Sequence, residues 1–280
     1  MGDRVVALSG SRAVRIGDVV IQPVDLADRD AIQLLLEQAR PTVIVHLAAV
    51  SSVAEALKDP QRTQWVNVDA TVWLVEQARR IGARFLYASS DLVFDGTAPP
   101  YDESSRPAPL SCYGRSKLQA EPVVLDHADG VVVRPSLMFG LGAVRRPTTF
   151  ARQLVALRDG LALRLFQDEF RTALWLDDAA GAIAAIGRSD FVGLAHLAGP
   201  ERISRLEMGL AMAEALGVRT DAIEAVSASS MSFPEPRPAD VSLDGGLLRR
   251  TFPDLPPPLT VRQAVARISP DELARLPAAD

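Results

Sequence analysis

Apolar residues in the first half of the chain alternate between short continuous runs and longer segments with helical spacing. The short runs are rich in Val, Ile and Leu, which is typical of strands that helices cover on both faces. Strands that alternate with helices predict βαβ units and a parallel sheet. The predicted strands are Arg4–Leu8, Val19–Val24, Thr42–Leu47, Arg84–Ala88 and Gly130–Val133, and the predicted helices are Asp28–Arg40, Pro60–Ile81 and Tyr113–His127.

The order of elements becomes less regular after residue 141. A strand is predicted over Leu161–Phe166, and two Pro-rich stretches read as loops, at Phe233–Pro238 and Pro253–Pro258. The helices predicted in this half are Thr148–Arg158, Asp177–Arg188, Ser204–Leu216 and the short Thr260–Ile268.

Composition and charge narrow the class of protein. A chain of 280 residues with 48% hydrophobic residues predicts a globular protein with an ample core. The net charge of −5 gives no reason to expect nucleic acid or an anionic membrane as a partner. No signal peptide or spanning segment is visible, and the single cysteine, Cys112, excludes an intrachain disulfide framework, so a cytoplasmic protein is expected. No metal site is predicted.

The candidate chemistry begins with the pentapeptide Tyr113-Gly-Arg-Ser-Lys117. In a helix, residues four apart share a face, so the Tyr113 phenol and the Lys117 ammonium are expected to be neighbours. A nearby cation favours the phenolate, so Lys117 is expected to ease ionisation of Tyr113, whose ordinary pKa is about 10. Ser89 and Ser90 end a predicted strand, and ligands of parallel sheets bind at that end of the strands.

The motifs in this order resemble the extended branch of the short-chain dehydrogenase/reductase family, in particular its dTDP-4-dehydrorhamnose reductase-like sugar-nucleotide reductases. Three motifs carry the resemblance most strongly: Ser89-Ser-Asp-Leu-Val-Phe-Asp-Gly96, Tyr113-Gly-Arg-Ser-Lys117-Leu-Gln-Ala-Glu121 and Arg134-Pro-Ser-Leu-Met-Phe-Gly140. The resemblance implies an α/β fold with a doubly wound (Rossmann) parallel sheet and a smaller C-terminal substrate lobe. The sheet domain would comprise residues 1–141 with 172–198, and the substrate lobe residues 142–171 with 199–280.

The resemblance also implies roles for individual residues. Tyr113 would protonate a carbonyl oxygen as hydride arrives, Lys117 would tune Tyr113 and bind the nicotinamide ribose, and Ser90 would polarise the carbonyl. Asn67 is similar to the family's helix asparagine near the active site. The residues implied for cofactor binding are Arg12, Asp25, Leu47, Ala48, Ala49, Ser89, Tyr113, Lys117, Pro135 and Ser136, and those for the substrate are Ser90, Asp91, Arg171 and Arg237.

Simpler interpretations stay open for several of these residues. Ser90 can be a cap at the end of a strand, and Asp25 a turn residue. Arg171 and Arg237 can be surface ion-pair residues instead of clamps for a diphosphate. His46, in an apolar strand, is predicted to be a packed core histidine.

The glycine-rich turn that should follow the first strand of a dinucleotide-binding domain is absent from this sequence. Residues 2–12 resemble the family's second strand and its turn, so the sheet is expected to be N-terminally truncated. Three explanations stay open: a start codon assigned too far downstream, a shortened chain, or Arg4–Leu8 in the place of the first strand. The first two are favoured because a gap inside a sheet leaves backbone groups unpaired.

The function expected from these patterns is NAD(P)-dependent reduction of a keto-deoxysugar nucleotide. Arg12 with small neighbours favours NADP(H) over NAD(H), because an arginine there accommodates the 2′-phosphate. Leu92 and Leu137 stand where the rhamnose-pathway reductases usually carry aromatic residues, so the identity of the sugar stays open. The alternatives are a non-catalytic regulatory or binding member of the fold and a sugar-nucleotide epimerase. A homodimer through Pro60–Ile81 and Tyr113–His127 is expected by analogy.

Overall fold

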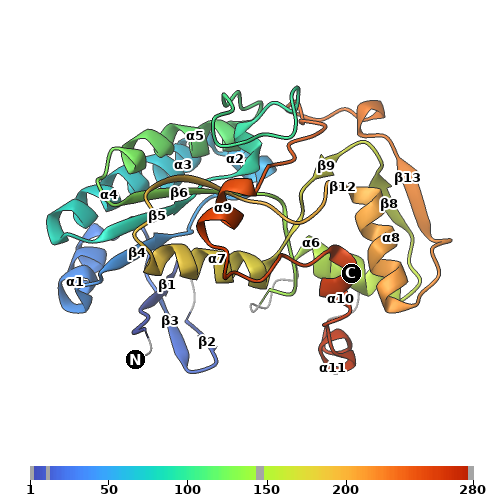
Figure 1. Ribbon diagram of the computed structural model, residues 1–280, viewed down its shortest axis with the longest axis horizontal. Helices are drawn as coiled ribbons and strands as arrows, with labels where there is room; N and C mark the ends of the chain where they lie inside the picture. The colour runs from blue at the N-terminus through green and yellow to red at the C-terminus, as the bar shows by residue number, and fades with distance from the viewer. Residues whose placement is uncertain (1–2, 11–12, 143–147, 277–280) are drawn as a thin grey trace.

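Four parallel strands form the main sheet in the order β11–β6–β5–β4 (Figure 1). The structure is a computed structural model that describes residues 3–10, 13–142 and 148–276. The strands are β4 (Val43–His46), β5 (Arg84–Ala88), β6 (Gly130–Pro135) and β11 (Gly193–Leu197). In the register, Val45 lies opposite Leu86, and Leu86 lies opposite Val131. The predicted α/β class with a parallel sheet is confirmed, although β11 was not predicted because its Gly-Leu-Ala-His-Leu sequence is short and carries a histidine.

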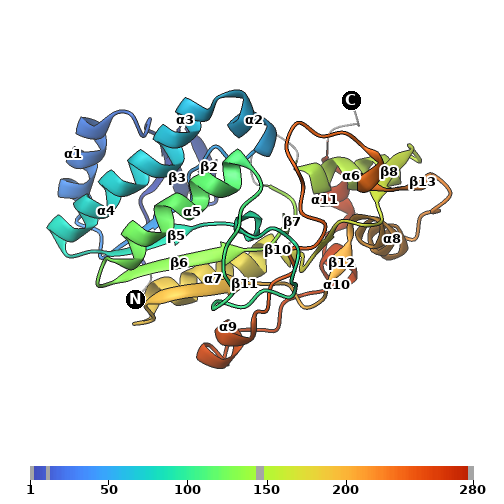
Figure 2. The same ribbon diagram turned by 90° about the horizontal axis from the view of Figure 1, so that it is seen from above.

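Helices cover both faces of this sheet (Figures 1 and 2). On one face α1 (Arg29–Ala39), α4 (Ala70–Ile81) and α5 (Cys112–Leu125) bury a core around Phe85 and Tyr87. On the other face α7 (Leu176–Arg188) packs its alanines and Ile186 against Leu86, Val131 and Val133. Successive residues of a strand point to opposite faces, so covering both faces requires the continuously apolar strands seen in the sequence.

The N-terminal strands form a separate small sheet. β1 (Ala7–Ser9) runs parallel to β3 (Val19–Pro23), and β2 (Val14–Ile16) joins the far side of β3 as a hairpin. Among the residues that the structure describes, no ladder connects β1 to β4. The proposal that Arg4–Leu8 takes the place of the first strand is therefore wrong, since β1 leaves the free edge of β4 unpaired.

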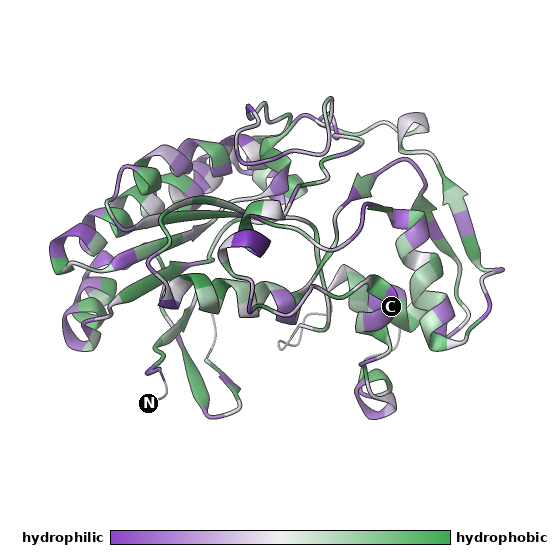
Figure 3. Cartoon of the chain, in the orientation of Figure 1, coloured by the Kyte–Doolittle hydropathy of each residue, from purple (hydrophilic) through white to green (hydrophobic). Residues whose placement is uncertain are grey.

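Apolar side chains remain exposed on both sides of this break. Leu8 is 44% exposed on β1, while Val45 and Leu47 at β4 are 43% and 56% exposed. Figure 3 shows the hydrophobic colouring of the main sheet continuing into this N-terminal region. Apolar strand residues next to an unpaired edge are typical of a position that another strand covers.

The smaller lobe has its own core of aromatic and aliphatic residues. Helices α6 (Thr149–Arg158), α8 (Arg205–Leu216) and α10 (Val261–Val265) pack around Phe150 and Met212. β8 (Leu163–Phe166) pairs in parallel with β13 (Ile223–Val226) at the edge of this lobe. This separate core supports the proposed division of the chain into a sheet domain and a substrate lobe.

The predicted helix over Pro60–Ile81 is continuous but not uniform. It begins as α3 (Pro60–Gln64), passes through a π-helical turn η1 (Trp65–Asp69) and continues as α4. π-Turns inside helices are frequently found at functional sites. The remaining short elements are α2 (Val53–Lys58), η2 (Asp91–Val93), β7 (Met138–Phe139), β9 (Phe170–Arg171), β10 (Leu174–Trp175), β12 (Ile203–Ser204), η3 (Ala228–Ser230), α9 (Gly246–Thr251) and α11 (Pro270–Ala274).

Candidate functional site

The carboxyl end of β5 places two serines and a carboxylate in the interior. The Ser90 hydroxyl accepts a hydrogen bond from Leu92 N at 3.1 Å, and so it caps the 3-10 turn η2. The same hydroxyl donates to Asp91 Oδ1 at 3.1 Å. Burial raises the pKa of Asp91, although the Arg171 guanidinium and the Ser90 hydrogen bond oppose that effect. Ser90 is thus a strand-end cap whose hydroxyl also belongs to a buried polar cluster.

Helix α5 brings Tyr113 to this cluster. Ser111 caps the helix by accepting from Gly114 N at 3.0 Å. Gly114 packs so closely on η2 that a Cβ atom there would lie 2.2 Å from Leu92 O. This contact holds the first turn of α5 against the end of β5, and the Tyr113 and Ser90 side chains are hydrogen-bonded. The structure brings Ser90 and Tyr113 together, and the roles expected for them stay predictions.

Tyr113 is 8% exposed, and its environment keeps the phenol protonated. Burial raises the pKa of Tyr113 to about 12, although the hydrogen bond with Ser90 lowers it and the Asp91 charge adds to the rise. The expectation that Lys117 eases this ionisation stays a prediction. The Lys117 ammonium lies over the Tyr87 ring, with Nζ 4.2 Å from the ring centroid. Burial lowers the pKa of Lys117 to about 7, while Glu121 raises it.

Asn67 joins helix α5 to the loop after β4. It lies in the π-turn η1, where its side chain accepts from Val50 N at 2.8 Å and donates to Val50 O at 3.2 Å. Its amide also donates to Ser116 Oγ at 2.9 Å, and Ser116 Oγ donates to the Tyr113 carbonyl at 2.7 Å. Asn67 therefore ties the Tyr113 backbone to the residues expected to line the cofactor.

Several residues expected to bind the nicotinamide half of a cofactor lie around this cluster. Ser136, just after β6, is buried and donates to Asp91 Oδ2 at 3.4 Å. Pro135 ends β6 and is buried. Leu47 and Ala48 are exposed after β4, and Ala49 is half-buried. These residues leave an accessible strand end beside Tyr113 and Lys117, which fits a nicotinamide and its ribose.

The residues expected to bind the adenine and phosphate half of the cofactor do not form a comparable site in the described part of the chain. The Asp25 carboxylate accepts from Ala27 N at 2.9 Å, as a turn residue does, and Arg12 lies outside the described residues. Helix α1 begins with the Asp28 carboxylate on Ala31 N, and Asp30 follows in its first turn. Negative charge there disfavours phosphate. Within the described ranges, no glycine-rich turn opens a helix to form a phosphate cradle.

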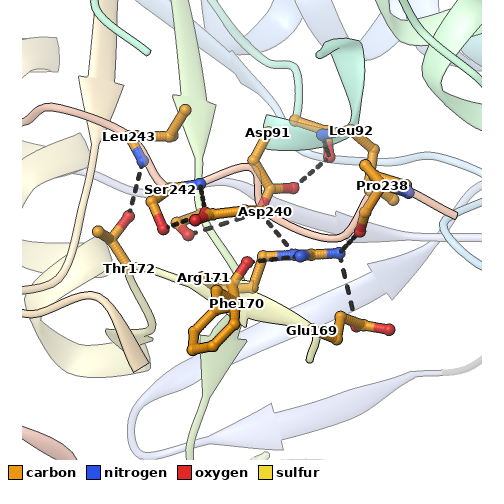
Figure 4. A network of polar contacts seen from close by, with 12 residues as sticks. Asp91, Leu92, Glu169, Phe170, Arg171, Thr172, Pro238, Asp240, Ser242 and Leu243 are labelled. Carbon is orange, nitrogen blue, oxygen red and sulfur yellow. Dashed lines mark hydrogen bonds and ion pairs between the residues drawn. The ribbon is translucent and has the colours of Figure 1, made fainter. Parts of the chain in front are cut away.

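An arginine cluster lies next to Asp91. Glu169 is buried and bonds three guanidiniums, those of Arg171 at 3.4 Å, Arg205 at 3.0 Å and Arg237 at 2.8 Å. Arg171 lies between Glu169 and Asp91, 3.7 Å from the Asp91 carboxylate (Figure 4). Burial raises the pKa of Glu169, but the three cations outweigh burial and hold it below its ordinary value. Three cations against two carboxylates leave one excess positive charge.

Arg237 also lies at the wall of a pocket. The cavity has a volume of about 470 Å³ and is lined by Glu169, Phe233, Glu235 and Arg237, among others. The Arg237 guanidinium lies 4.8 Å from the centroid of Phe233. Arg171 and Arg237 are therefore brought together on one carboxylate, and Arg237 is also open to a ligand because its side chain is 41% exposed.

Sequence reasoning missed three functional candidates. Glu169 and Arg205 organise the arginine cluster, but they are far apart in the chain and form no motif. Glu235 accepts hydrogen bonds from Cys112 N at 2.8 Å and from Arg115 at 3.2 Å, and so it connects the pocket loop to the first turn of α5. The Pro-rich composition of that loop predicted a loop and nothing about its contacts.

Three further observations concern the residues that the structure describes. His46 is buried, and burial lowers its pKa to about 3, which confirms it as a packed core histidine. None of the helices in the described part of the chain is long and apolar enough to cross a bilayer. Within the same residues, no cluster of three His, Cys, Asp or Glu side chains is arranged to hold a metal ion.

Comparisons with known proteins agree with this geometry. A methionine adenosyltransferase 2 subunit beta from Xenopus tropicalis is 30% identical over 235 residues, which cover 81% of this chain and 70% of that protein. A dTDP-4-dehydrorhamnose reductase from Sinorhizobium fredii is 30% identical over 241 residues, which cover 81% of this chain and 80% of that enzyme. The structure of RMD from Pseudomonas aeruginosa, complexed with NADPH, is similar with a TM-score of 0.72 and 25% identity, covering 93% of this chain and 92% of that one.

The family model of the RmlD substrate binding domain matches residues 2–271, nearly the whole chain. Its extent agrees with the parallel sheet and with the resemblance seen in the motifs. This protein belongs to the RmlD substrate binding domain family.

Proposed function

We propose that this protein is an NAD(P)H-dependent carbonyl reductase that acts on a keto-deoxysugar nucleotide. The observation that carries the proposal is the hydrogen bond between the buried Ser90 and Tyr113 side chains at the carboxyl end of β5. A hydroxyl held beside a protonated phenol is suited to bind and protonate a carbonyl oxygen. The relatives named as reductases, and the neighbour solved with NADPH, support this chemistry.

We assign a separate role in the reduction to each of Ser90, Tyr113 and Lys117. Ser90 would turn its hydroxyl from Asp91 to donate to the substrate oxygen, and Tyr113 would transfer its phenolic proton to that oxygen as the alcohol forms. The hydride to the carbonyl carbon would come from a reduced nicotinamide, whose ribose Lys117 would hold. Lys117 stabilises the phenolate that Tyr113 becomes, provided its ammonium is protonated. Water afterwards returns a proton to Tyr113.

The substrate class is supported by the arginine cluster. Arg171 contacts Asp91 beside the reaction centre, and Arg237 reaches the pocket from the other side of Glu169. Guanidiniums in fixed positions are suited to a diphosphate, and Arg237 lines the pocket. A sugar placed at Tyr113 with its nucleotide diphosphate at the arginines accounts for both features.

The test is turnover of a dTDP-4-keto-sugar with NADPH and with NADH, followed by Tyr113→Phe. We expect a clear NADPH preference and a loss of roughly 10²–10⁴-fold in kcat for the variant, the usual size of general acid catalysis. NADPH affinity and the unfolding midpoint of the variant should stay unchanged. Unchanged kcat in Tyr113→Phe would refute the acid role, and a preference for NADH would refute the cofactor assignment.

A second function is favoured by the break between β1 and β4. The described residues supply no phosphate cradle, and several similar proteins are named as methionine adenosyltransferase 2 subunit beta. A non-catalytic subunit that binds a methionine adenosyltransferase would need the fold but not the hydride donor. Fluorescence titration distinguishes the two: absence of NADPH binding at millimolar concentration, together with co-elution with the host's methionine adenosyltransferase, would favour the subunit.

A further inference from the structure

Lysine is used sparingly in this chain. Of the 30 basic residues only two are lysines, Lys58 and Lys117, and the other 28 are arginines. Lys58 is exposed at the end of α2, whereas Lys117 is 2% exposed. An arginine stays charged under all ordinary conditions, but a buried lysine can lose its proton near neutral pH. Lys117, as the buried lysine, is therefore a cation whose charge can change near neutral pH.

The Tyr87 ring packs against the Lys117 side chain. It lies on β5, two residues before Ser89, and its ring is fully buried. The Lys117 ammonium lies over the ring face, with Nζ 4.2 Å from the centroid, and the Tyr87 hydroxyl donates to the Lys117 carbonyl at 3.4 Å. The His46 ring stacks near Tyr87 on the neighbouring strand, with centroids 5.9 Å apart and planes 26° apart.

The other titratable groups around Lys117 are engaged elsewhere. Glu121, one turn along α5, accepts from Ser89 at 2.5 Å and from two nitrogens of Arg134. His46 Nε2 lies 3.1 Å from Thr71 Oγ1, and the Tyr113 side chain is hydrogen-bonded with Ser90. In the part of the chain that the structure describes, no carboxylate forms an ion pair with Lys117. The Tyr87 ring face is thus a direct contact of the ammonium, and the Glu121 charge also favours the protonated form.

We propose that Tyr87 is a positioning residue, whose ring face holds the Lys117 ammonium beside Tyr113 and keeps it charged. The inference deepens the proposed function, since it assigns a residue that sets the state of Lys117 in the reductase site. A cation over an aromatic face is stabilised by the ring quadrupole, and more so when it is desolvated. The ring therefore works against the burial that lowers the Lys117 pKa to about 7.

The two lysines make a direct test possible without any substrate. In protein labelled with ¹³C,¹⁵N-lysine, only two lysine side chains give signals, and Lys58→Arg assigns them. We expect the Lys117 ε-CH₂ signals to be shifted upfield by the ring current of Tyr87 and to titrate near pH 7. Lys117 signals without a ring-current shift would overturn the proposal.

Substitutions of Tyr87 distinguish stabilisation of the Lys117 ammonium from a packing role of the ring. Tyr87→Leu removes the aromatic face, and it should lower the Lys117 pKa by about one unit. Tyr87→Phe keeps the face and should keep the pKa and the upfield shift. Phe85→Leu, at a buried aromatic residue on the same strand and face, is the matched packing control and should leave Lys117 unchanged. An unchanged pKa in Tyr87→Leu, or an equal shift in Phe85→Leu, would contradict the proposal.

Activity gives a second readout. If charged Lys117 supports Tyr113, kcat/KM falls as the pH rises through the Lys117 pKa, and Tyr87→Leu moves that decline about one pH unit toward acid. A decline at the same pH in both proteins would count against the proposal. If Tyr87→Leu does not fold, Tyr87→Phe decides, because loss of the upfield shift there would overturn the assignment. Absence of turnover would affect only the proposed function, since the NMR titration needs no reaction.

Discussion

Arg134 at the end of β6 forms a two-pronged ion pair with Glu121 of α5. Arg134 Nε lies 2.9 Å from Glu121 Oε1, and Nη2 lies 2.6 Å from Oε2, with both side chains buried. Ser89 donates to the same Oε1 at 2.5 Å. One carboxylate therefore joins the ends of β5 and β6 to the helix that carries Tyr113 and Lys117.

Glu121→Gln should lower the free energy of unfolding by about 3–5 kcal/mol, because Arg134 would be left as an uncompensated buried charge. Urea denaturation of both proteins measures the difference. Glu76→Gln, at an exposed position of α4, is the control and should change stability by less than about 0.5 kcal/mol. The joint replacement Glu121→Leu with Arg134→Met should recover much of the loss. A loss below about 1 kcal/mol in Glu121→Gln would show that the pair does not join these elements.

Gly114→Ala should reduce turnover far more than Gly181→Ala. A Cβ atom at Gly114 meets Leu92 O at 2.2 Å, so α5 must move away from η2 and take Tyr113 away from Ser90. At Gly181, inside α7, a Cβ atom meets nothing within 4 Å, and alanine there should stabilise the helix by about 0.5–1 kcal/mol. Steady-state kinetics and thermal unfolding of the two variants check this. Equal activity in both would mean that the α5–η2 contact does not position Tyr113.

Arg237→Ala should weaken binding of a nucleoside diphosphate roughly 10–100-fold, the effect of losing one charge-assisted hydrogen bond. Its side chain is 41% exposed, so stability should change little. Isothermal titration with dTDP measures the affinity, and Arg267→Ala, at an exposed position just after α10, is the control for net charge. Equal losses in the two variants would indicate that only overall charge attracts the ligand.

Stability should fall as the pH drops from about 6.5 toward 4. Burial lowers the pKa of His46 to about 3 and that of His196 to about 4, while unfolded histidines titrate near 6.5. In this window the unfolded chain binds protons that the native protein does not, so each histidine lowers the free energy of unfolding by up to about 1.4 kcal/mol per pH unit. Denaturant titrations at several pH values measure the slope. The double variant His46→Gln, His196→Gln should show a smaller slope, whereas an equal slope would mean that these histidines are not buried in the neutral form.

Much of the site was predictable because its residues end neighbouring elements of a parallel sheet. Ser90 follows β5, Ser136 follows β6, and Tyr113 opens the helix between them, so the topology alone brings the three together. The position of the Lys117 side chain was not predictable. Spacing places it on the face of Tyr113, but its contact with the fully buried Tyr87 ring depends on packing between α5 and β5.

The sequence by itself determined the alternation of strands and helices, the order of the Ser90, Tyr113 and Lys117 motifs, and the absence of a glycine-rich turn in the residues given. These features depend on local period and on residue type, which can be read from neighbours in the chain. Only the tertiary structure decided that β1 leaves β4 unpaired, that Glu169 gathers three arginines and that Tyr87 holds Lys117. These contacts join residues far apart in the sequence, and burial sets their energies, so no local pattern encodes them.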